Sequence, residues 1–278
     1  MLKYFTLLRP RQWIKNLLLF FPPFFGGNIF SLQPELIFFP FLAFCAAASG
    51  GYIINDIKDI DADRNHKEKQ FRSIAHGDIS LAAAVFFALL LVLVAFISAV
   101  FVSHWFFFYL TVYFLNSVAY SFFLKHFVIL DIFIISFGFL IRVLAGGEAF
   151  CVHVSDWLFM TVFLVSLFLA AGKRMGELVS MEGDAYRHRQ SLARYTPAFL
   201  EGTLWFSAAA ALVTYGLYTI EVEGGLFYTV PLAAFGLLRY IYIAMEGRGD
   251  PTEALLGDGS IMAVGIIWGL MIGFIVYR

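Results

Sequence analysis

The chain has 278 residues, of which 61% are hydrophobic and only 14% are charged, and its mean hydropathy is +0.81. These values exclude an ordinary water-soluble globular domain and are typical of a protein that lies mostly within a membrane. The formal net charge is −1, and the acidic and basic residues are mixed. Such a mixture does not indicate a nucleic-acid-binding protein, which would favour a basic stripe.

Apolar runs long enough to cross a bilayer recur along the whole chain. We expect an all-α, polytopic membrane protein that forms one transmembrane domain over residues 1–278. Nine transmembrane helices are predicted, over residues 14–30, 34–55, 80–102, 104–123, 128–147, 156–173, 198–220, 226–246 and 259–277. The first of them is the weakest, because Pro22 and Pro23 break or kink a helix.

Lysine and arginine lie before the first span and in every second connection between spans. The alternate connections, near residues 31–33, 103, 148–155 and 221–225, contain neither residue type. Basic residues accumulate on the cytoplasmic side of membrane proteins. We therefore expect a cytoplasmic N-terminus and a C-terminus on the outer side.

An acidic run follows the second predicted span, at residues 55–63. On a helix, Asp56, Asp59 and Asp63 fall within an arc of about 60°, with Asn55 beside them and Asp61 on the opposite side. Three carboxylates on one face form a hard-oxygen surface suited to Mg²⁺, which commonly shares its ligands with a substrate phosphate. The alternative is a solvated charge run on a cytoplasmic loop.

Basic residues accompany the acidic run. Lys67, Lys69 and Arg72 are candidates to neutralise phosphate oxygens that a metal ion does not cover, and arginine favours a bidentate contact. Lys58 and Arg64 lie next to the acids and are further candidate substrate contacts.

The pattern Asn55-Asp56-x-x-Asp59-x-x-x-Asp63, followed by Arg72-x-Ile74-Ala75-x-Gly77, resembles the first signature of UbiA-type intramembrane prenyltransferases. The resemblance implies nine membrane helices around a central cavity that opens to the cytoplasm and laterally to the bilayer. It also implies a Mg²⁺-diphosphate site that faces the cytoplasm.

Several shorter motifs resemble one branch of that family, the decaprenyl-phosphate phosphoribosyltransferases. They are residues 9–16 (RPRQWIKN), 59–64 (DIDADR), 173–178 (KRMGEL), 191–196 (SLARYT) and 239–251. The branch implies transfer of 5-phosphoribosyl from phosphoribosyl pyrophosphate to a polyprenyl phosphate, releasing pyrophosphate, for a cell-envelope polysaccharide or glycolipid. The implied location is the inner (plasma) membrane of a prokaryote, and homo-oligomerisation is left open.

A second charged cluster follows the sixth predicted span. Aromatic prenyltransferases carry two acids four residues apart here, whereas this chain has Glu177 and Met181. Lys173 and Arg174 stand close by, and cations suit a donor that brings a second anionic group, as phosphoribosyl pyrophosphate does. The alternative is that these two residues only mark the cytoplasmic end of the helix.

The basic segment before the first span offers another candidate contact. Arg9, Arg11 and Lys15 lie beside Trp13, an arrangement suited to a lipid phosphate, and Asn16 belongs to the same motif. The alternative is that these side chains anchor the first helix by reaching the interface.

Arg142 lies within the fifth predicted span, where an arginine normally needs an anionic partner or a polar cavity, so it is also a candidate substrate contact. Asp131, near the start of the same span, is interpreted as an interfacial acid or a polar lining residue.

Three functions compete for the acidic run. Phosphoribosyl transfer and prenyl transfer from a polyprenyl diphosphate to an aromatic acceptor both use Asp56, Asp59 and Asp63, and the second cluster favours ribosyl transfer. A transporter that binds a cation places its polar residues near the bilayer midplane. Here the acids lie at the cytoplasmic end, so an enzyme is preferred.

Overall fold

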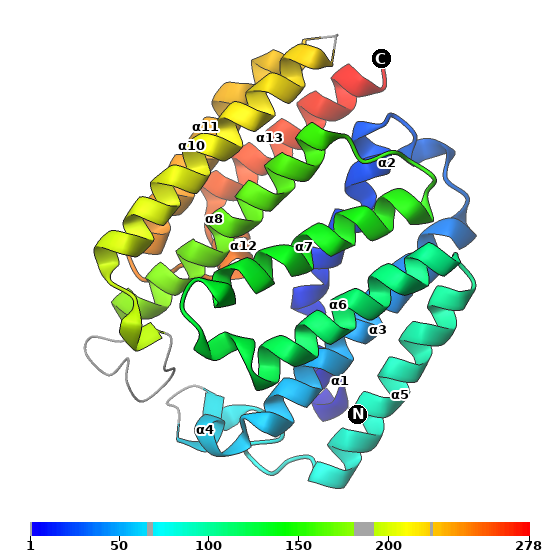
Figure 1. Ribbon diagram of the computed structural model, residues 1–278, viewed down its shortest axis with the longest axis vertical. Helices are drawn as coiled ribbons and strands as arrows, with labels where there is room; N and C mark the ends of the chain where they lie inside the picture. The colour runs from blue at the N-terminus through cyan, green and yellow to red at the C-terminus, as the bar shows by residue number, and fades with distance from the viewer. Residues whose placement is uncertain (1, 66–68, 181–191, 223–224) are drawn as a thin grey trace. The chain divides into compact units, whose positions relative to one another are not determined.

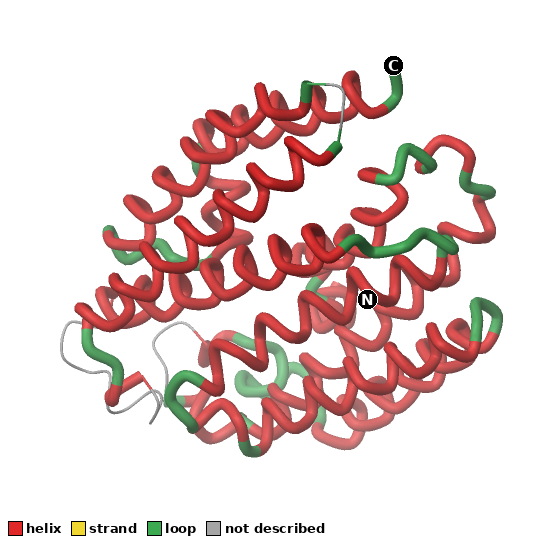
Figure 2. Tube along the Cα trace, turned by 45° about the horizontal axis from the view of Figure 1, so that its top comes forward, coloured by secondary structure: helices red, strands yellow, loops and turns green. Residues whose placement is uncertain are grey.

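A computed structural model describes residues 2–65, 69–180, 192–222 and 225–278, and every regular element in that part of the chain is helical (Figure 2). Seven segments there are long and apolar enough to cross a membrane (Figure 1). They belong to α3 (Pro34–Lys58), α5 (Leu81–Val100), α7 (Leu130–Ala149), α8 (Asp156–Ser180), α10 (Pro197–Glu221), the pair η6 (Leu226–Thr229) and α11 (Val230–Met245), and α13 (Gly259–Val276). The structure is thus that of an all-α, multi-pass membrane protein.

The predicted count of nine is not confirmed. A single helix over residues 14–30 is wrong, because the chain there forms a 3₁₀ helix η1 (Pro10–Phe20), the short α2 (Phe21–Phe25) and a 3₁₀ turn η2 (Ile29–Ser31). Pro22 and Pro23 lack the N–H groups that would continue a helix from η1. Residues 104–123 do form a helix, α6 (His104–Phe122), but its histidine, tyrosines and asparagine reduce its hydropathy.

The first of two compact units comprises Met1–Pro22, Ser31–Phe127 and Ile141–Val152. Within it α3 packs against α5 and α6. Small residues permit the approach, since a Cβ on Gly51 would lie 2.7 Å from Ser117 Oγ and one on Gly50 would lie 3.1 Å from a methyl group of Val92. Close packing through small residues is the usual way in which membrane helices associate.

The end of α3 positions the acidic run. The helix continues to Lys58, so Asp56 stands in its last turn, and Asp59 interrupts it with φ −99° and ψ 11°. The short α4 (Ile60–Arg64) follows at once, and Asp63 N donates to Asp59 O at 2.8 Å, which preserves the helical register across the break.

A small apolar cluster fixes the segment after α4. That segment contains the 3₁₀ turn η3 (Lys69–Phe71), and its Ile74 and Ile79 are each 4% exposed. They pack with Leu7 of α1 (Leu2–Leu8), Ile53 of α3 and the first turns of α5. Burial of these side chains therefore holds the N-terminal helix and the loop against the end of α3.

The second unit comprises Pro23–Phe30, Val128–Leu140 and His153–Arg278. In it α8 packs against α10 and α11, and α11 packs against α13. The 3₁₀ turn η5 (Leu192–Arg194) and α12 (Pro251–Gly257) complete this unit, while η4 (Leu124–His126) belongs to the first. Helix α7 contributes its first part to the second unit and its remainder to the first.

Candidate active site

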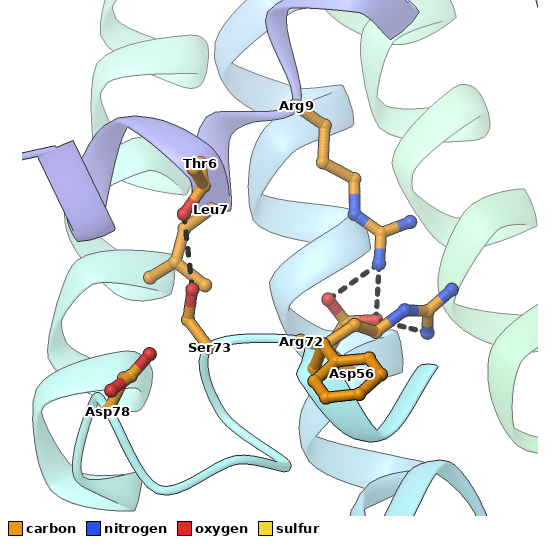
Figure 3. A pocket seen from close by; sticks show the side chains of 8 residues that line it. Thr6, Leu7, Arg9, Asp56, Arg72, Ser73 and Asp78 are labelled. Carbon is orange, nitrogen blue, oxygen red and sulfur yellow. Dashed lines mark hydrogen bonds and ion pairs between the residues drawn. The ribbon is translucent and has the colours of Figure 1, made fainter. Parts of the chain in front are cut away.

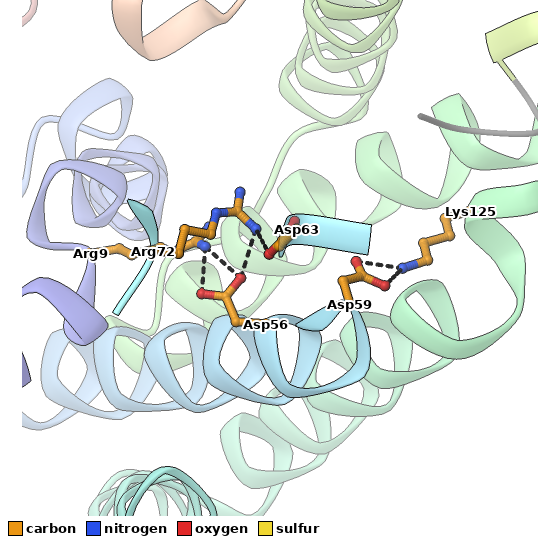
Figure 4. Close-up of polar contacts among 6 residues, drawn as sticks. All are labelled: Arg9, Asp56, Asp59, Asp63, Arg72 and Lys125. Carbon is orange, nitrogen blue, oxygen red and sulfur yellow. Dashed lines mark hydrogen bonds and ion pairs between the residues drawn. The ribbon is translucent and has the colours of Figure 1, made fainter. Parts of the chain in front are cut away.

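Two arginines meet two carboxylates at the end of α3 (Figure 4). Nη2 of Arg9 donates hydrogen bonds to both carboxylate oxygens of Asp56, each at 2.6 Å. Arg72 Nη1 bridges the two acids, at 2.9 Å from Asp56 Oδ1 and 2.7 Å from Asp63 Oδ2. Asp56 and Asp63 thus both bind the guanidinium group of Arg72, which agrees with their spacing of two helical turns.

The N-terminal segment presents Arg9 to this cluster through contacts with α3. Ser49, which is fully buried, donates its hydroxyl to the Leu8 carbonyl at 2.7 Å, and the indole N–H of Trp13 donates to the same hydroxyl at 3.0 Å. Arg9 itself has φ 50° and ψ 58°, a left-handed conformation that is strained for a residue with a Cβ. Such strain is found at functional sites held by their surroundings.

Asp59 does not join the other two acids. Its carboxylate accepts from Lys125 Nζ at 2.6 and 2.7 Å, and in Figure 4 it points away from the Arg72 guanidinium. The helix break at Asp59 and the attraction of Lys125, in η4, give it this different direction. The structure therefore does not gather all three carboxylates as the helical projection predicted, and the part of the chain that it describes contains no cluster of three potential metal-ligating side chains.

Lys125 was missed by reasoning from the sequence. Its side chain is only 7% exposed, and the ion pair with Asp59 gives it a place beside the acidic run. The available signal was its isolation, since it is the one lysine or arginine in the connection after residue 123. In the sequence alone, a lone cation at that place indicates only the orientation of the chain in the membrane.

In this cluster the two carboxylates are buried, whereas the two arginines that bind them are partly exposed to solvent. Asp56 and Asp63 are 5% and 4% exposed, whereas the side chains of Arg9 and Arg72 are 25% and 29% exposed. Buried carboxylates need a cationic or hydrogen-bonding partner. Because both arginines reach solvent, they are able to turn to an incoming anion.

The remaining candidates on the acidic loop are dispersed. Asn55 is half-buried, Lys58 lies over the ring of Phe122 at 5.6 Å, and Lys69 is half-buried in η3. Arg64 donates to the Ala75 carbonyl at 3.3 Å and lies 3.7 Å from Asp61, whose side chain is 97% exposed. Lys67 lies outside the described residues.

Asn16 and Arg142 form a separate buried group in the same unit. Arg142 Nε donates to Asn16 Oδ1 at 2.8 Å, and Arg142 Nη2 donates to the Tyr113 hydroxyl at 2.8 Å. The Asn16 amide nitrogen donates to Cys45 Sγ at 3.2 Å. Asn16 is fully buried and Arg142 is 5% exposed, while Lys15 is half-buried in η1.

The second charged cluster is a closed network. Arg174, 1% exposed, donates to Asp131 Oδ2 at 2.7 Å and to Glu177 Oε2 at 2.6 Å. The Tyr195 hydroxyl donates to Asp131 Oδ1 at 2.6 Å and accepts from Ile129 N at 2.7 Å. Burial and the neighbouring Asp131 carboxylate raise the pKa of Tyr195 well above its usual value.

The position of Asp131 corrects an expectation. It is fully buried rather than interfacial, and its two oxygens are both used inside the protein. Arg174 is likewise enclosed, so a substrate would reach its guanidinium only if this network opened.

Lys173 differs from Arg174. Its ammonium group donates to Asp250 Oδ2 at 2.8 Å, and its side chain is 35% exposed. Asp250 also caps the N-terminus of α12 by accepting from Thr252 N at 3.0 Å. Gly249, the residue before Asp250, packs directly on α8, since a Cβ on Gly176 would lie only 2.3 Å from Gly249 N.

The comparisons with known proteins agree with this architecture. A model of the UbiA prenyltransferase family matches residues 20–274. The chain belongs to this family. The decaprenyl-phosphate phosphoribosyltransferase of Mycolicibacterium smegmatis is 36% identical to it, over 97% of this chain and 91% of the relative. The enzyme of the same description from Mycobacterium tuberculosis is 33% identical, over 96% and 91% respectively.

Solved structures show the same UbiA fold. A UbiA homologue from Archaeoglobus fulgidus, bound to GPP and Mg²⁺, has a TM-score of 0.76 to this chain and 19% sequence identity, with 99% of each chain covered. At that identity the likeness concerns the fold alone. Together with the family assignment, it makes the protein a multi-pass membrane enzyme, a transferase of the UbiA family.

Proposed function

We propose that the protein transfers 5-phosphoribosyl from phosphoribosyl pyrophosphate to a polyprenyl phosphate and releases pyrophosphate. The observation that carries this proposal is the pair of mycobacterial relatives, which are named decaprenyl-phosphate phosphoribosyltransferase and align over nearly their whole length. The motifs of residues 9–16 and 173–178, which resemble the same branch, support it.

The donor's diphosphate is assigned to the Asp56 cluster. Arg9 and Arg72 supply guanidinium groups with the geometry to bind phosphate oxygens in pairs. Asp56 and Asp63 both reach a single cation, Arg72 Nη1, so their oxygens also fit one Mg²⁺ ion, with Asp59 as the proposed third ligand. Bound there, Mg²⁺ would neutralise charge on the departing pyrophosphate.

The reaction breaks the bond from ribose C1 to the pyrophosphate oxygen and forms one from C1 to an oxygen of the polyprenyl phosphate. Arg9 and Arg72 stabilise the charge that develops on pyrophosphate as C1 becomes oxocarbenium-like. The acceptor phosphate is ionised at neutral pH and attacks without a general base. The site accordingly needs cations and orientation rather than a proton-transfer residue.

Six of the other predicted contacts fall into two groups. Lys173, Lys15 and Lys69 are half-buried lysines that we retain as proposed substrate contacts. Arg174, Arg142 and Asn16 are enclosed by protein partners, and we assign them the role of orienting their neighbours.

We also propose that the protein is one domain in the plasma membrane of a prokaryote, with a cytoplasmic N-terminus, an outer C-terminus and a site that faces the cytoplasm. The alternation of basic and base-free connections supports this orientation. The Asp56 cluster then meets phosphoribosyl pyrophosphate from the cytosol, while the acceptor arrives through the bilayer.

A transfer assay tests the reaction. Membranes containing the protein are incubated with ribose-labelled phosphoribosyl pyrophosphate, a polyprenyl phosphate and Mg²⁺, and label is measured in the organic-extractable lipid. We expect incorporation that is lost when EDTA removes the metal. The proposal fails if no label enters the lipid while the same membranes prenylate a hydroxybenzoate from a polyprenyl diphosphate.

A further inference from the structure

A pocket of about 380 Å³ lies beside the Asp56 cluster (Figure 3). This volume falls within the range of small-molecule sites in proteins. The pocket belongs wholly to the first compact unit. Its walls come from α1, the residue that follows it, the end of α3 and the loop after α4. The lining residues are Thr6, Leu7, Arg9, Asp56, Phe71, Arg72, Ser73 and Asp78.

The two ends of the pocket differ chemically. Arg9 and Arg72 meet Asp56 at one end, which is the proposed diphosphate site. Thr6 and Ser73 lie to the other side in Figure 3, with Asp78 beyond them. The Thr6 and Ser73 hydroxyls are 3.1 Å apart and share a hydrogen bond.

This second end suits a group that carries several hydroxyls. The oxygen of a hydroxyl group has two lone pairs, so Thr6 and Ser73 oxygens have the chemistry to accept hydrogen bonds from the hydroxyls of a ligand. A carboxylate such as Asp78 accepts hydrogen bonds from ribose hydroxyls, as acidic residues do in dinucleotide sites. An isoprenyl chain would instead cover these polar groups without replacing their hydrogen bonds to water, which is unfavourable.

We propose, building on the function proposed above, that Thr6, Ser73 and Asp78 bind the 2- and 3-hydroxyls of the donor's ribose. The diphosphate at Arg9 and Arg72 places C1, and hence the neighbouring C2, next to this wall. The 5-phosphate is carried on C5, which projects from the ring face opposite the 2,3-diol and so directs the phosphate away from the Asp78 carboxylate that would repel it. The wall thereby selects a phosphoribosyl donor against a prenyl diphosphate.

The loop is built to hold this wall in place. The Ser73 carbonyl accepts from Ile79 N at 3.1 Å, which closes the segment on itself, and Ile74 and Ile79 are buried at its two ends. Gly77 makes the intervening turn with φ 86°, a conformation that glycine adopts readily. His76 Nδ1 lies 3.5 Å from Asp78 Oδ1 and flanks its carboxylate. A wall of fixed geometry discriminates between substrates because little reorganisation is needed to bind the correct one.

The test compares two probes that share the diphosphate and differ by the 5-phosphoribosyl group. Purified full-length protein, its Thr6→Val and Asp78→Ala variants and the control Asp61→Asn are titrated with phosphoribosyl pyrophosphate and with pyrophosphate, each with Mg²⁺. Asp61 is a suitable control because it is an exposed acid of the neighbouring α4, outside the pocket. We expect each pocket variant to bind phosphoribosyl pyrophosphate about 10- to 100-fold more weakly. Pyrophosphate affinity should change less than about twofold.

A donor analogue sharpens the result. The 2-deoxy analogue of phosphoribosyl pyrophosphate should bind wild-type protein more weakly than the parent compound, and the Thr6→Val and Asp78→Ala variants should discriminate less between the two. Non-additivity of this kind reports a direct contact, which a merely structural change would not produce.

The outcomes separate the two proposals. If wild-type protein transfers the labelled ribose unit and Thr6→Val and Asp78→Ala bind both probes normally, or lose both equally, the ribose wall is wrong and the transfer reaction stands. If wild-type protein instead accepts geranyl diphosphate and does not bind phosphoribosyl pyrophosphate, the proposed function fails and the ribose assignment fails with it.

Discussion

The Asp56 cluster and the Asp131 network are both built around arginine–aspartate ion pairs and differ in how far those pairs are exposed. In the Asp56 cluster the arginine side chains are about a quarter exposed and adjoin a pocket. In the Asp131 network Arg174 is 1% exposed and Asp131 is fully buried, with a tyrosine hydroxyl on the remaining carboxylate oxygen. The first arrangement is able to exchange its partners for a ligand, whereas the second is closed.

The difference shows why an arginine–aspartate pair is not by itself a functional signal. A buried pair mainly avoids the cost of an uncompensated charge, so its loss is felt in stability. A pair whose cations reach solvent holds its acids in place and still offers guanidinium groups to an anion. Substitutions in the two regions should therefore separate effects on stability from effects on binding.

The largest expected effect comes from breaking the closed network with Arg174→Met. The change leaves the buried Asp131 without its cation, which should lower the free energy of unfolding by about 3–5 kcal/mol. Arg9→Met is the matched control, because Asp56 retains Arg72, and its stability loss should be below about 1 kcal/mol while pyrophosphate binding weakens. Denaturant unfolding in detergent micelles measures the first quantity and calorimetry the second. Equal destabilisation by both changes would contradict the distinction between the regions.

Asp56→Asn should lower the rate of the transfer reaction. Loss of this carboxylate charge removes a proposed metal ligand and a partner of both arginines, so we expect kcat/KM for transfer to fall about 10²–10³-fold. The transfer assay measures the loss, and Mn²⁺ binding followed by electron paramagnetic resonance reports the metal site separately. Asp61→Asn, an exposed acid five residues away, should change kcat/KM by less than about twofold. A comparable loss at Asp61 would mean that bulk charge on the loop, rather than geometry, governs activity.

Lys125→Ala tests whether the ion pair between Lys125 and Asp59 serves activity, as the Asp56 cluster is proposed to do, or stability alone, as the Asp131 network is expected to do. Its ammonium group is nearly buried, and Asp59 is partly exposed, so removal should cost about 1–3 kcal/mol through the lost charge-assisted hydrogen bonds. If Asp59 serves the metal site, Lys125→Arg should retain most activity while Lys125→Ala does not. An unaltered kcat/KM in Lys125→Ala, together with lower stability, would place this pair with the closed networks.

The sequence predicts the helices well because their apolar runs are long and are interrupted by polar residues between the spans. Each expected span after the first falls on a helix. Helix α8 extends beyond residue 173 to Ser180, and Lys173 and Arg174 near this end have acidic partners outside α8, Asp250 and Asp131. The first span failed because a diproline and a 3₁₀ segment stand within an apolar run, and hydropathy does not register backbone geometry.

The candidate site was predictable only where local spacing determines it. Asp56 and Asp63 share Arg72 because they are two turns apart, which a helical projection captures. Asp59 turns to Lys125, 66 residues away, and Arg174 to Asp131, 43 residues away. Such partners depend on tertiary packing, so a projection of one helix cannot supply them.

Tyr195→Phe makes the smallest change and tests whether the Asp131 network is purely structural. The tyrosine hydroxyl donates to Asp131 and accepts from Ile129 N, and Ile129 has φ 69°, a strained value for a β-branched residue. Removing this hydroxyl leaves Arg174 on Asp131, so the free energy of unfolding should fall by only about 0.5–1.5 kcal/mol. Unfolding in detergent measures that loss, and KM for phosphoribosyl pyrophosphate should stay within about twofold of wild type. A large rise in KM with unchanged stability would show that Tyr195 acts on the substrate, and the closed network would then have to be regarded as part of the binding site.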